Sequence, residues 1–173
     1  MESINLLEKM DSLRREINHD LKQCLYVENC DQLESFEDKL LKNPEFGADA
    51  YNADHLWHKT VNGMHSRILF ISKGDFLTGR IHKAPYIDIL VSGKVIVRSF
   101  MEDGSEEPAE VHIGPKFFEG REGRKRVLEA MEDCVWITVD RTEHSEIEDI
   151  KREVVFMKMH EYRKASNLIE VGK

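Results

Sequence analysis

The residues best able to do chemistry lie between Gly74 and Gly93. Arg80 and His82 stand two residues apart, and Tyr86 follows four residues after the histidine. Because residues two apart on a β-strand face the same side, Arg80 and His82 share a face if this segment is extended. A guanidinium binds phosphate or carboxylate through a fork of hydrogen bonds, and imidazole and phenol groups add donors or stack on a base. This group is typical of a site for a small anion.

A second basic segment, residues 121–126, carries four cations in six residues. Arg126 in this segment supplies a second guanidinium, which would make the predicted site cationic. A phosphorylated metabolite or a nucleotide fits such a lining. The predicted ligand-binding residues are Arg80, His82, Lys83, Tyr86, Lys125 and Arg126.

A structural role is the alternative for the two arginines. In that interpretation Arg80 and Arg126 form ion pairs within the fold. Asp88 and Glu129 are the carboxylates that would pair with them. The segment 121–126 as a whole is short and lacks interleaved aromatic residues, so it predicts a solvated turn rather than a nucleic-acid site.

Metal binding is a second interpretation, because the chain has eight histidines. His55 and His58 lie within one turn of each other if their segment is helical. No carboxylate lies at ligand spacing on a shared motif, so we interpret the histidines as exposed or packing side chains. We therefore expect no cofactor, and His82 is the remaining candidate for a metal ligand.

Two kinds of periodicity divide the chain. Apolar residues at three- and four-residue steps predict a helix over 1–25, and a capping residue and a terminating proline predict a short helix over 32–42. Residues 45–55 read as a linker or loop. From Leu56 the pattern alternates with period two, and a final helix is predicted over 145–164. The predicted strands are 66–72, 86–91, 94–100, 109–113, 125–130 and 134–141.

Composition limits the class of protein. The chain has 173 residues, of which 40% are hydrophobic and 34% charged, as expected for one globular domain. Its formal net charge of −8 disfavours broad binding to a phosphate backbone. No secretory signal or membrane-spanning run is visible. Three cysteines without CxxC spacing indicate reduced thiols, and Cys24 and Cys134 are expected to be small buried hydrophobes.

The spacing between Gly74 and Gly93 resembles the first motif of the cupin family. That family usually has His, His and Glu where this chain has Arg80, His82 and Tyr86. Its second motif is best matched by residues 123–126, with an arginine in place of the final histidine. The resemblance implies a β-barrel with an inward-facing site, which Arg126 approaches from a neighbouring strand. The substitutions imply loss of the usual metal, since guanidinium groups cannot ligate a cation and repel it.

A branch of small cupin-like proteins of tailed bacteriophages is similar over about residues 56–153. One departure is Tyr86, where that branch leads us to expect a second histidine. The branch as a whole implies no particular activity. The shared elements are Trp57-His58, Ile81-His82-Lys83, Gly123-Arg124-Lys125-Arg126, Glu132-Asp133-Cys134-Val135-Trp136 and Thr142-Glu143.

We therefore predict a mostly-β fold, a cupin-like antiparallel β-barrel (jelly roll) with an N-terminal helical extension and a C-terminal helix. The predicted divisions are a helical extension and linker over 1–55, the barrel over 56–144, and a C-terminal helix and tail over 145–173.

The predicted role is non-enzymatic: a phage-type protein that binds a small anionic ligand or a protein partner and forms a homo-oligomer, a dimer. One alternative is a divergent metal-dependent cupin enzyme of the isomerase or dioxygenase type. Another is a structural protein that docks on a virion or host target through its N-terminal helices. We expect a cytoplasmic location, in the host cytoplasm for a phage-encoded chain, with virion association also open. Neither a membrane nor a nucleic acid is an expected partner.

Overall fold

The computed structural model describes residues 30–41, 56–101, 103 and 105–171. The helix predicted over 1–25, the loop predicted over 45–55 and Cys24 lie outside these residues. Within them the protein is mostly antiparallel β-structure with three helices, α2, α3 and α4.

Five strands form the larger sheet, and every neighbouring pair is antiparallel. β-branched and aromatic residues alternate with polar ones along them, which suits a sheet with one face turned to a core. In spatial order the strands are β1 (Leu56–Val61), β2 (Met64–Ile71), β10 (Cys134–Arg141), β5 (Tyr86–Ser92) and β8 (Lys116–Gly120).

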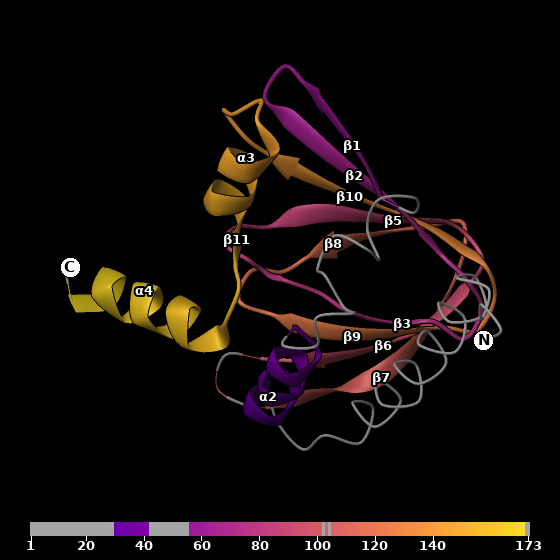
Figure 1. Cartoon of the computed structure of the whole chain (residues 1–173), viewed down its shortest axis with the longest axis horizontal. Coiled ribbons are helices and arrows are strands. Elements are labelled where there is room, and N and C mark those ends of the chain that lie inside the picture. The colour runs from indigo at the N-terminus through magenta and orange to yellow at the C-terminus, as the bar shows by residue number, and fades with distance from the viewer. Residues whose placement is uncertain (1–29, 42–55, 102, 104, 172–173) are drawn as a thin grey trace, which may run out of the picture.

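A four-stranded antiparallel sheet faces the first one, and the two sheets diverge toward the end where the C-terminal helices lie (Figure 1). Its strands, in spatial order, are β3 (Phe76–Thr78), β9 (Lys125–Ala130), β6 (Lys94–Phe100) and β7 (Glu106–Ile113). This is the two-sheet architecture of a cupin-like jelly roll, as the sequence predicted. The described strands do not join into one closed barrel.

The predicted C-terminal helix over 145–164 is wrong in one respect, because the structure divides it. Helix α3 (Ile147–Val154) ends at Val155, whose backbone is extended at φ −134° and ψ 157°. Val155 and Phe156 then form β11, which pairs with β4 (Ile81–His82) before α4 (Met159–Val171) begins. A β-branched and an aromatic residue favour this extended pairing over a continuous helix.

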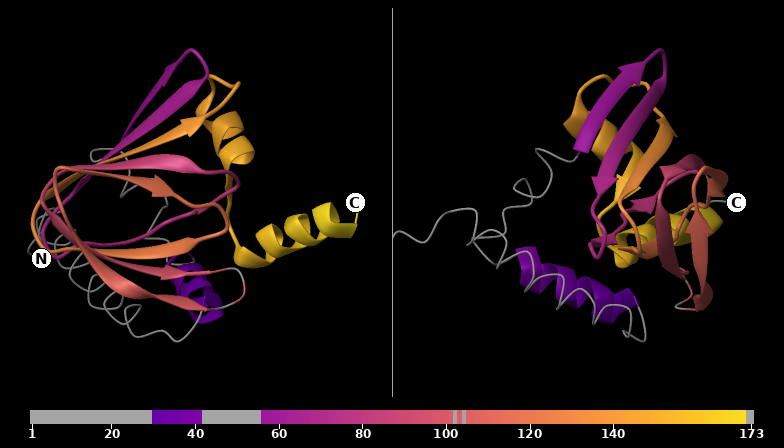
Figure 2. Two further views of the ribbon diagram at one scale, coloured as in Figure 1. Left: turned by 180° about the vertical axis from the view of Figure 1, so that it is seen from behind. Right: turned by 90° about the vertical axis from the view of Figure 1, so that its right-hand side faces the viewer.

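Helix α2 (Cys30–Leu41) is tied to the four-stranded sheet, and Figure 2 shows it from two further sides. Glu37 pairs with the buried Lys125 of β9, whose Nζ lies 2.8 Å from the carboxylate. Leu33 is fully buried in an apolar cluster beneath the helix. That cluster comprises Cys30, Leu33, Phe76, Ile81, Phe100, Val127 and Met159.

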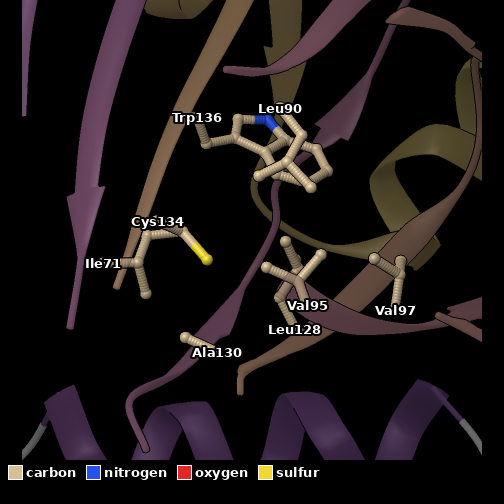
Figure 3. Close-up of a cluster of buried hydrophobic side chains, with 8 residues drawn as sticks. All are labelled: Ile71, Leu90, Val95, Val97, Leu128, Ala130, Cys134 and Trp136. Carbon is tan, nitrogen blue, oxygen red and sulfur yellow. The ribbon is translucent and has the colours of Figure 1, made fainter. Parts of the chain in front are cut away.

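A second apolar cluster lies between the sheets toward the end where they approach each other (Figure 3). It draws residues from both sheets, as inward-facing positions of a sandwich do. Its members are Ile71, Leu90, Val95, Val97, Leu128, Ala130, Cys134 and Trp136. The prediction that Cys134 is a small buried hydrophobe is confirmed.

Candidate functional site

The interior of the sandwich holds a fully enclosed carboxylate, Asp88 on β5. Nη1 of Arg126 on β9 donates a hydrogen bond to Asp88 Oδ2 over 2.7 Å. Oδ1 accepts from the Trp136 indole N–H and from the Thr138 hydroxyl, each over 2.9 Å. Burial alone would lower the pKa of Arg126, but Asp88 raises it above its ordinary value. The pair is thus charged and its carboxylate is well satisfied, as a buried ion pair requires.

Tyr86 stands beside this pair and stacks on His82, with ring centres 3.6 Å apart and planes within 16°. The guanidinium of Arg126 lies 5.4 Å from the centre of the tyrosine ring. Across the β5–β8 ladder is Gly120, where an added Cβ atom would lie 2.2 Å from that ring. Only glycine leaves this space, so the ring fills this part of the interior. Burial raises the pKa of Tyr86, which keeps the phenol protonated.

His82 is also the first member of a row of imidazoles that continues through Asp140 to His65 and His58. Nδ1 of His82 lies 2.8 Å from Asp140 Oδ1 on β10. His65 Nδ1 lies 3.9 Å from Asp140 Oδ2, which is an electrostatic contact but too long for a hydrogen bond. The row ends with His58, whose Nδ1 lies 2.8 Å from His65 Nε2. One ring donates and the other accepts, according to the tautomer.

These rings face a cavity of about 420 Å³. It lies where β1, β2 and β10 meet the β4–β11 pair and helix α3, the group of elements at the end where the sheets diverge (Figure 1). Its lining combines cations and imidazoles with a few apolar side chains. The lining residues are Leu56, His58, His65, Arg67, Arg80, His82, Asp140, Ile150, Lys151, Val154 and Val155.

Positive charge predominates in this lining. Arg67, Arg80 and Lys151 contribute three cations, against the single carboxylate of Asp140. Lys151 also pairs with Glu148 on the outer side of α3, over 2.7 Å. Within the described part of the chain the Arg67 guanidinium makes no direct ion pair; burial lowers its pKa, and the charges of Asp140 and Asp88 oppose that shift. Its charge is therefore available to a ligand.

The pKa shifts of the cavity follow from burial and from these charges. Burial, with His65 and Arg67 nearby, lowers the pKa of His58 to about 4. Burial also lowers the pKa of His82, although Asp140 opposes the shift. For Asp140 itself, burial would raise the pKa, but the adjacent His65 and His82 rings hold it well below its usual range. At neutral pH the imidazoles of His58 and His82 are thus neutral, Asp140 is ionised, and the guanidinium groups of Arg67 and Arg80 are charged.

Four of the six predicted site residues line the cavity or belong to the Tyr86–Arg126 group next to it. Arg80 and His82 both line the cavity, as expected from their spacing. Arg80 also contacts the sulfur of Met157. Tyr86 separates His82 from Arg126, and Arg126 is held by Asp88 rather than facing the cavity. For Arg126 the structure therefore shows the ion pair that the sequence left as the alternative.

The two predicted lysines point to other parts of the molecule. Lys83 donates to the backbone carbonyl of Arg152 over 2.5 Å and lies 4.3 Å from the Phe156 ring centre. Lys125 is buried against Glu37 of α2. Each lysine thus attaches a helical segment to the sheets. The structure brings neither of them to the 420 Å³ cavity.

Two local predictions are corrected. The solvated turn predicted over 121–126 is wrong at its end, because β9 begins at Lys125 and buries both Lys125 and Arg126. Arg121 and Arg124 instead pair with Glu107, over 3.1 and 3.2 Å. The helical turn considered around His58 is also wrong, because this residue lies in strand β1.

Sequence reasoning did not select Arg67, His65, His58, Asp140 or Lys151 as parts of one site. A signal was present in β2 and β10, where His65, Arg67 and Asp140 occupy the inward-facing positions of otherwise apolar strands. A charged residue at such a position needs a partner or a function. What the sequence does not supply is the pairing of these strands, which places Asp140 opposite His65.

Among the residues that the structure describes, no three His, Cys, Asp or Glu side chains come together in a way that could hold a metal ion. None of the described helices is both long and apolar enough to cross a bilayer.

The fold and site together define a cupin-like jelly roll with a cationic, imidazole-rich cavity beside a buried ion pair. No family model matches the sequence, and no curated protein matches it. Solved structures show a likeness of fold. An oxalate decarboxylase of Lactobacillus farciminis is 11% identical, with a TM-score of 0.46; the match covers 61% of this chain and 32% of that one.

Two further solved structures are similar at lower scores. A cupin-2 domain protein of Shewanella frigidimarina is 9% identical with a TM-score of 0.40, over 61% of this chain and 98% of that one. A cupin superfamily protein of Desulfitobacterium hafniense is 3% identical with a TM-score of 0.39, over 53% of this chain and 82% of that one. These likenesses carry no information on activity.

Proposed function

We propose that this protein binds a small anionic ligand, a phosphorylated metabolite or a nucleotide, in the 420 Å³ cavity between the five-stranded sheet and α3. The observation that supports the proposal is the guanidinium of Arg67, which lines the cavity without a direct ion pair in the described part of the chain. A partly buried cation without a direct counter-ion is costly unless an anion accompanies it. A bound phosphate group would supply that anion.

The other groups of the lining suit the same ligand. Arg80 next to β4 and Lys151 on α3 add their positive charge to that of Arg67 on β2. Guanidinium groups bind phosphate oxygens in pairs, and neutral imidazoles donate further hydrogen bonds. His58 and His65 share one hydrogen bond, and the pair keeps one further N–H donor next to Arg67. A phosphate placed among these groups would meet donors on more than one side.

Size is consistent with a metabolite. Ligand pockets in proteins typically have volumes of about 300–1,000 Å³. The cavity of about 420 Å³ falls within that range and exceeds the space needed for a bare phosphate ion. Leu56, Ile150 and Val154 provide an apolar wall that can contact the remainder of the ligand. A phosphorylated organic molecule thus fits better than inorganic phosphate alone.

The binding role is non-enzymatic in this proposal, in keeping with the phage-type accessory protein that the sequence resembles. Asp88 and Arg126 satisfy each other. Among the cavity groups, His82 and Asp140 are likewise engaged with one another. These contacts leave the arginines of the cavity, rather than an activated nucleophile, to meet a ligand.

The proposal is tested by identifying what accompanies the purified protein. Native mass spectrometry of the full chain is expected to show an adduct, and analysis of the denatured sample to show that the adduct is phosphorylated. Isothermal titration with AMP in a phosphate-free buffer should then give saturable binding at one site per chain. A protein that carries no anion and binds neither AMP nor inorganic phosphate would contradict the proposal.

A further inference from the structure

The outer face of the five-stranded sheet carries a continuous row of large apolar side chains. The strand register places Trp57 beside Ile68 and Ile68 beside Ile137. Ile137 in turn lies beside Ile89, and Ile89 beside Phe117, so the row crosses all five strands from one edge to the other. Trp57 is 57% exposed and Phe117 is 71% exposed.

Neighbouring positions extend this row into a patch. Two residues along the strands on the same face, Val139 lies beside Ile87. Two residues in the opposite direction, Val135 lies beside Phe70. Phe70 also meets Trp57 edge to face, with ring centres 5.1 Å apart. Soluble proteins rarely leave an apolar surface of this extent uncovered, and such patches mark sites of association.

We propose that this face is the interface of a homodimer, in which two copies pack their five-stranded sheets face to face about a two-fold axis that runs along β10. This symmetric arrangement follows from the row of apolar residues, whose middle member, Ile137, lies on the central strand β10. With Ile137 near the axis, the edge strand β1 of one copy lies over the edge strand β8 of the other. Trp57 then meets Phe117 of the partner subunit, and the contact occurs twice by symmetry.

Charge supports a second copy as the occupant. A second row on the same face, two residues further along the strands, also crosses the sheet. It begins with Lys59 on β1 and ends with Glu119 on β8, with Ser66, Val139 and Ile87 between them. The same two-fold axis places Lys59 of one copy over Glu119 of the partner subunit. Opposite charges therefore meet at both edges of the interface, while its centre is apolar, as stable interfaces require.

The area also fits a dimer. Five strands at about 4.8 Å spacing and six residues of length at about 3.3 Å each give a face of roughly 24 by 20 Å. This is about 480 Å² in projection, and protruding side chains raise the accessible area toward the 800 Å² or so that each partner buries in a standard interface. Packed sheets of this kind lie about 10 Å apart with strands crossing at about 30°.

The cavity described above opens on the opposite face of the same sheet. Its side chains, among them His65, Arg67 and Asp140, alternate along their strands with the outward-facing residues. A dimer through the outer face thus leaves the cavity in place. This inference goes beyond the proposed ligand binding and stands independently of it.

Sedimentation velocity on the full-length protein at micromolar concentration tests the interface. The wild type is expected to sediment as a dimer, and Phe117→Asp as a monomer with unchanged circular dichroism. The matched control is Ile113→Asp, because Ile113 is 62% exposed but lies on β7 of the other sheet. A dimer is expected for this control. A monomeric wild type, or a dimer that survives Phe117→Asp, would overturn the proposal.

A charge exchange tests the two-fold arrangement more sharply. Lys59 and Glu119 of one chain are separated by four strand spacings, or about 19 Å, so they cannot pair within a chain. Lys59→Glu alone and Glu119→Lys alone are each expected to weaken dimerisation several-fold. The double exchange is expected to restore it to near the wild-type value, because each new pair forms between chains. Additive weakening in the double variant would show that the proposed axis is wrong.

Discussion

Nη1 of Arg126 lies 2.7 Å from Oδ2 of Asp88, and both side chains are buried between the two sheets. Asp88 also accepts hydrogen bonds from Trp136 and Thr138. This network connects β5, β9 and β10 and so links both sheets of the sandwich. It stands next to the Tyr86–His82 stack, beyond which the cationic cavity begins.

Removal of one member of this pair is expected to be costly. Arg126→Met leaves the Asp88 carboxylate buried without its counter-ion, which should lower the free energy of unfolding by about 3–5 kcal/mol. The double variant Asp88→Leu with Arg126→Met removes both charges and should recover most of that loss. Urea denaturation of the wild type and the variants measures the effect. A single variant as stable as the wild type would show that the pair is not what joins the sheets.

Helix α2 is expected to contribute to stability through Leu33, which is fully buried. Leu33→Ala leaves a space in the cluster with Phe76, Phe100 and Val127, and should cost about 2–5 kcal/mol. The control is Ser35→Ala on the exposed side of the same helix, for which we expect little change. Thermal or urea unfolding followed by circular dichroism compares them. Equal stability of Leu33→Ala and Ser35→Ala would indicate that α2 is not docked as described.

The two cysteines in the described residues are expected to be unreactive in the native state. Burial, followed by the charge of Glu34, raises the pKa of Cys30 to about 12. Burial also raises the pKa of Cys134. Because the thiolate is the nucleophile, iodoacetamide at neutral pH should alkylate these residues only after unfolding in urea. Peptide mass spectrometry reads each site separately, and rapid native alkylation of Cys30 would contradict the packing of α2.

The imidazoles predict how stability depends on pH. Burial and neighbouring cations lower the pKa of His58 from 6.5 to about 4, and burial also lowers those of His82 and His112. In the window from about pH 6.5 to about pH 4, the unfolded chain therefore binds more protons than the folded chain. The free energy of unfolding should fall as the pH falls through this window, and it should be largest above it.

The variant His58→Gln tests this assignment, because it removes one of the contributing groups. Its unfolding free energy should depend less steeply on pH between about 6.5 and about 4 than that of the wild type. His144→Gln is the control, since His144 is exposed. Chemical denaturation at several pH values provides the measurement. Equal slopes for His58→Gln and the wild type would show that His58 is not held neutral by its surroundings.

Local pattern was sufficient to predict much of the β-fold. Strands 94–100, 125–130 and 134–141 have the bounds that the alternation of β-branched residues indicates. β3 and β4 have only three and two residues, so they show no periodicity of their own. Their extended form depends on partners far away in the sequence, β9 and β11. The same holds for Val155 and Phe156, whose pairing with β4 divides the predicted C-terminal helix.

The candidate site was predictable only where its residues are linked by short spacing. His82 and Tyr86 come together because β4 leads directly into β5. Arg67 and Asp140 belong to strands that lie far apart in the sequence, and their meeting depends on the register of β2 against β10. Whether Arg126 meets Asp88 or a ligand was likewise open from the sequence. Only the packing of the two sheets decides it.

A titration with AMP tests whether the cavity is an anion site centred on Arg67. Calorimetric titration of AMP into the wild type, Arg67→Met and Arg141→Met compares the cavity guanidinium with that of Arg141, which is 87% exposed on β10. We predict saturable binding by the wild type and Arg141→Met, and at least a tenfold weaker affinity for Arg67→Met, equivalent to about 1.4 kcal/mol. Equal affinity of all three proteins, or no binding by the wild type, would show that the cavity is not an anion site centred on Arg67.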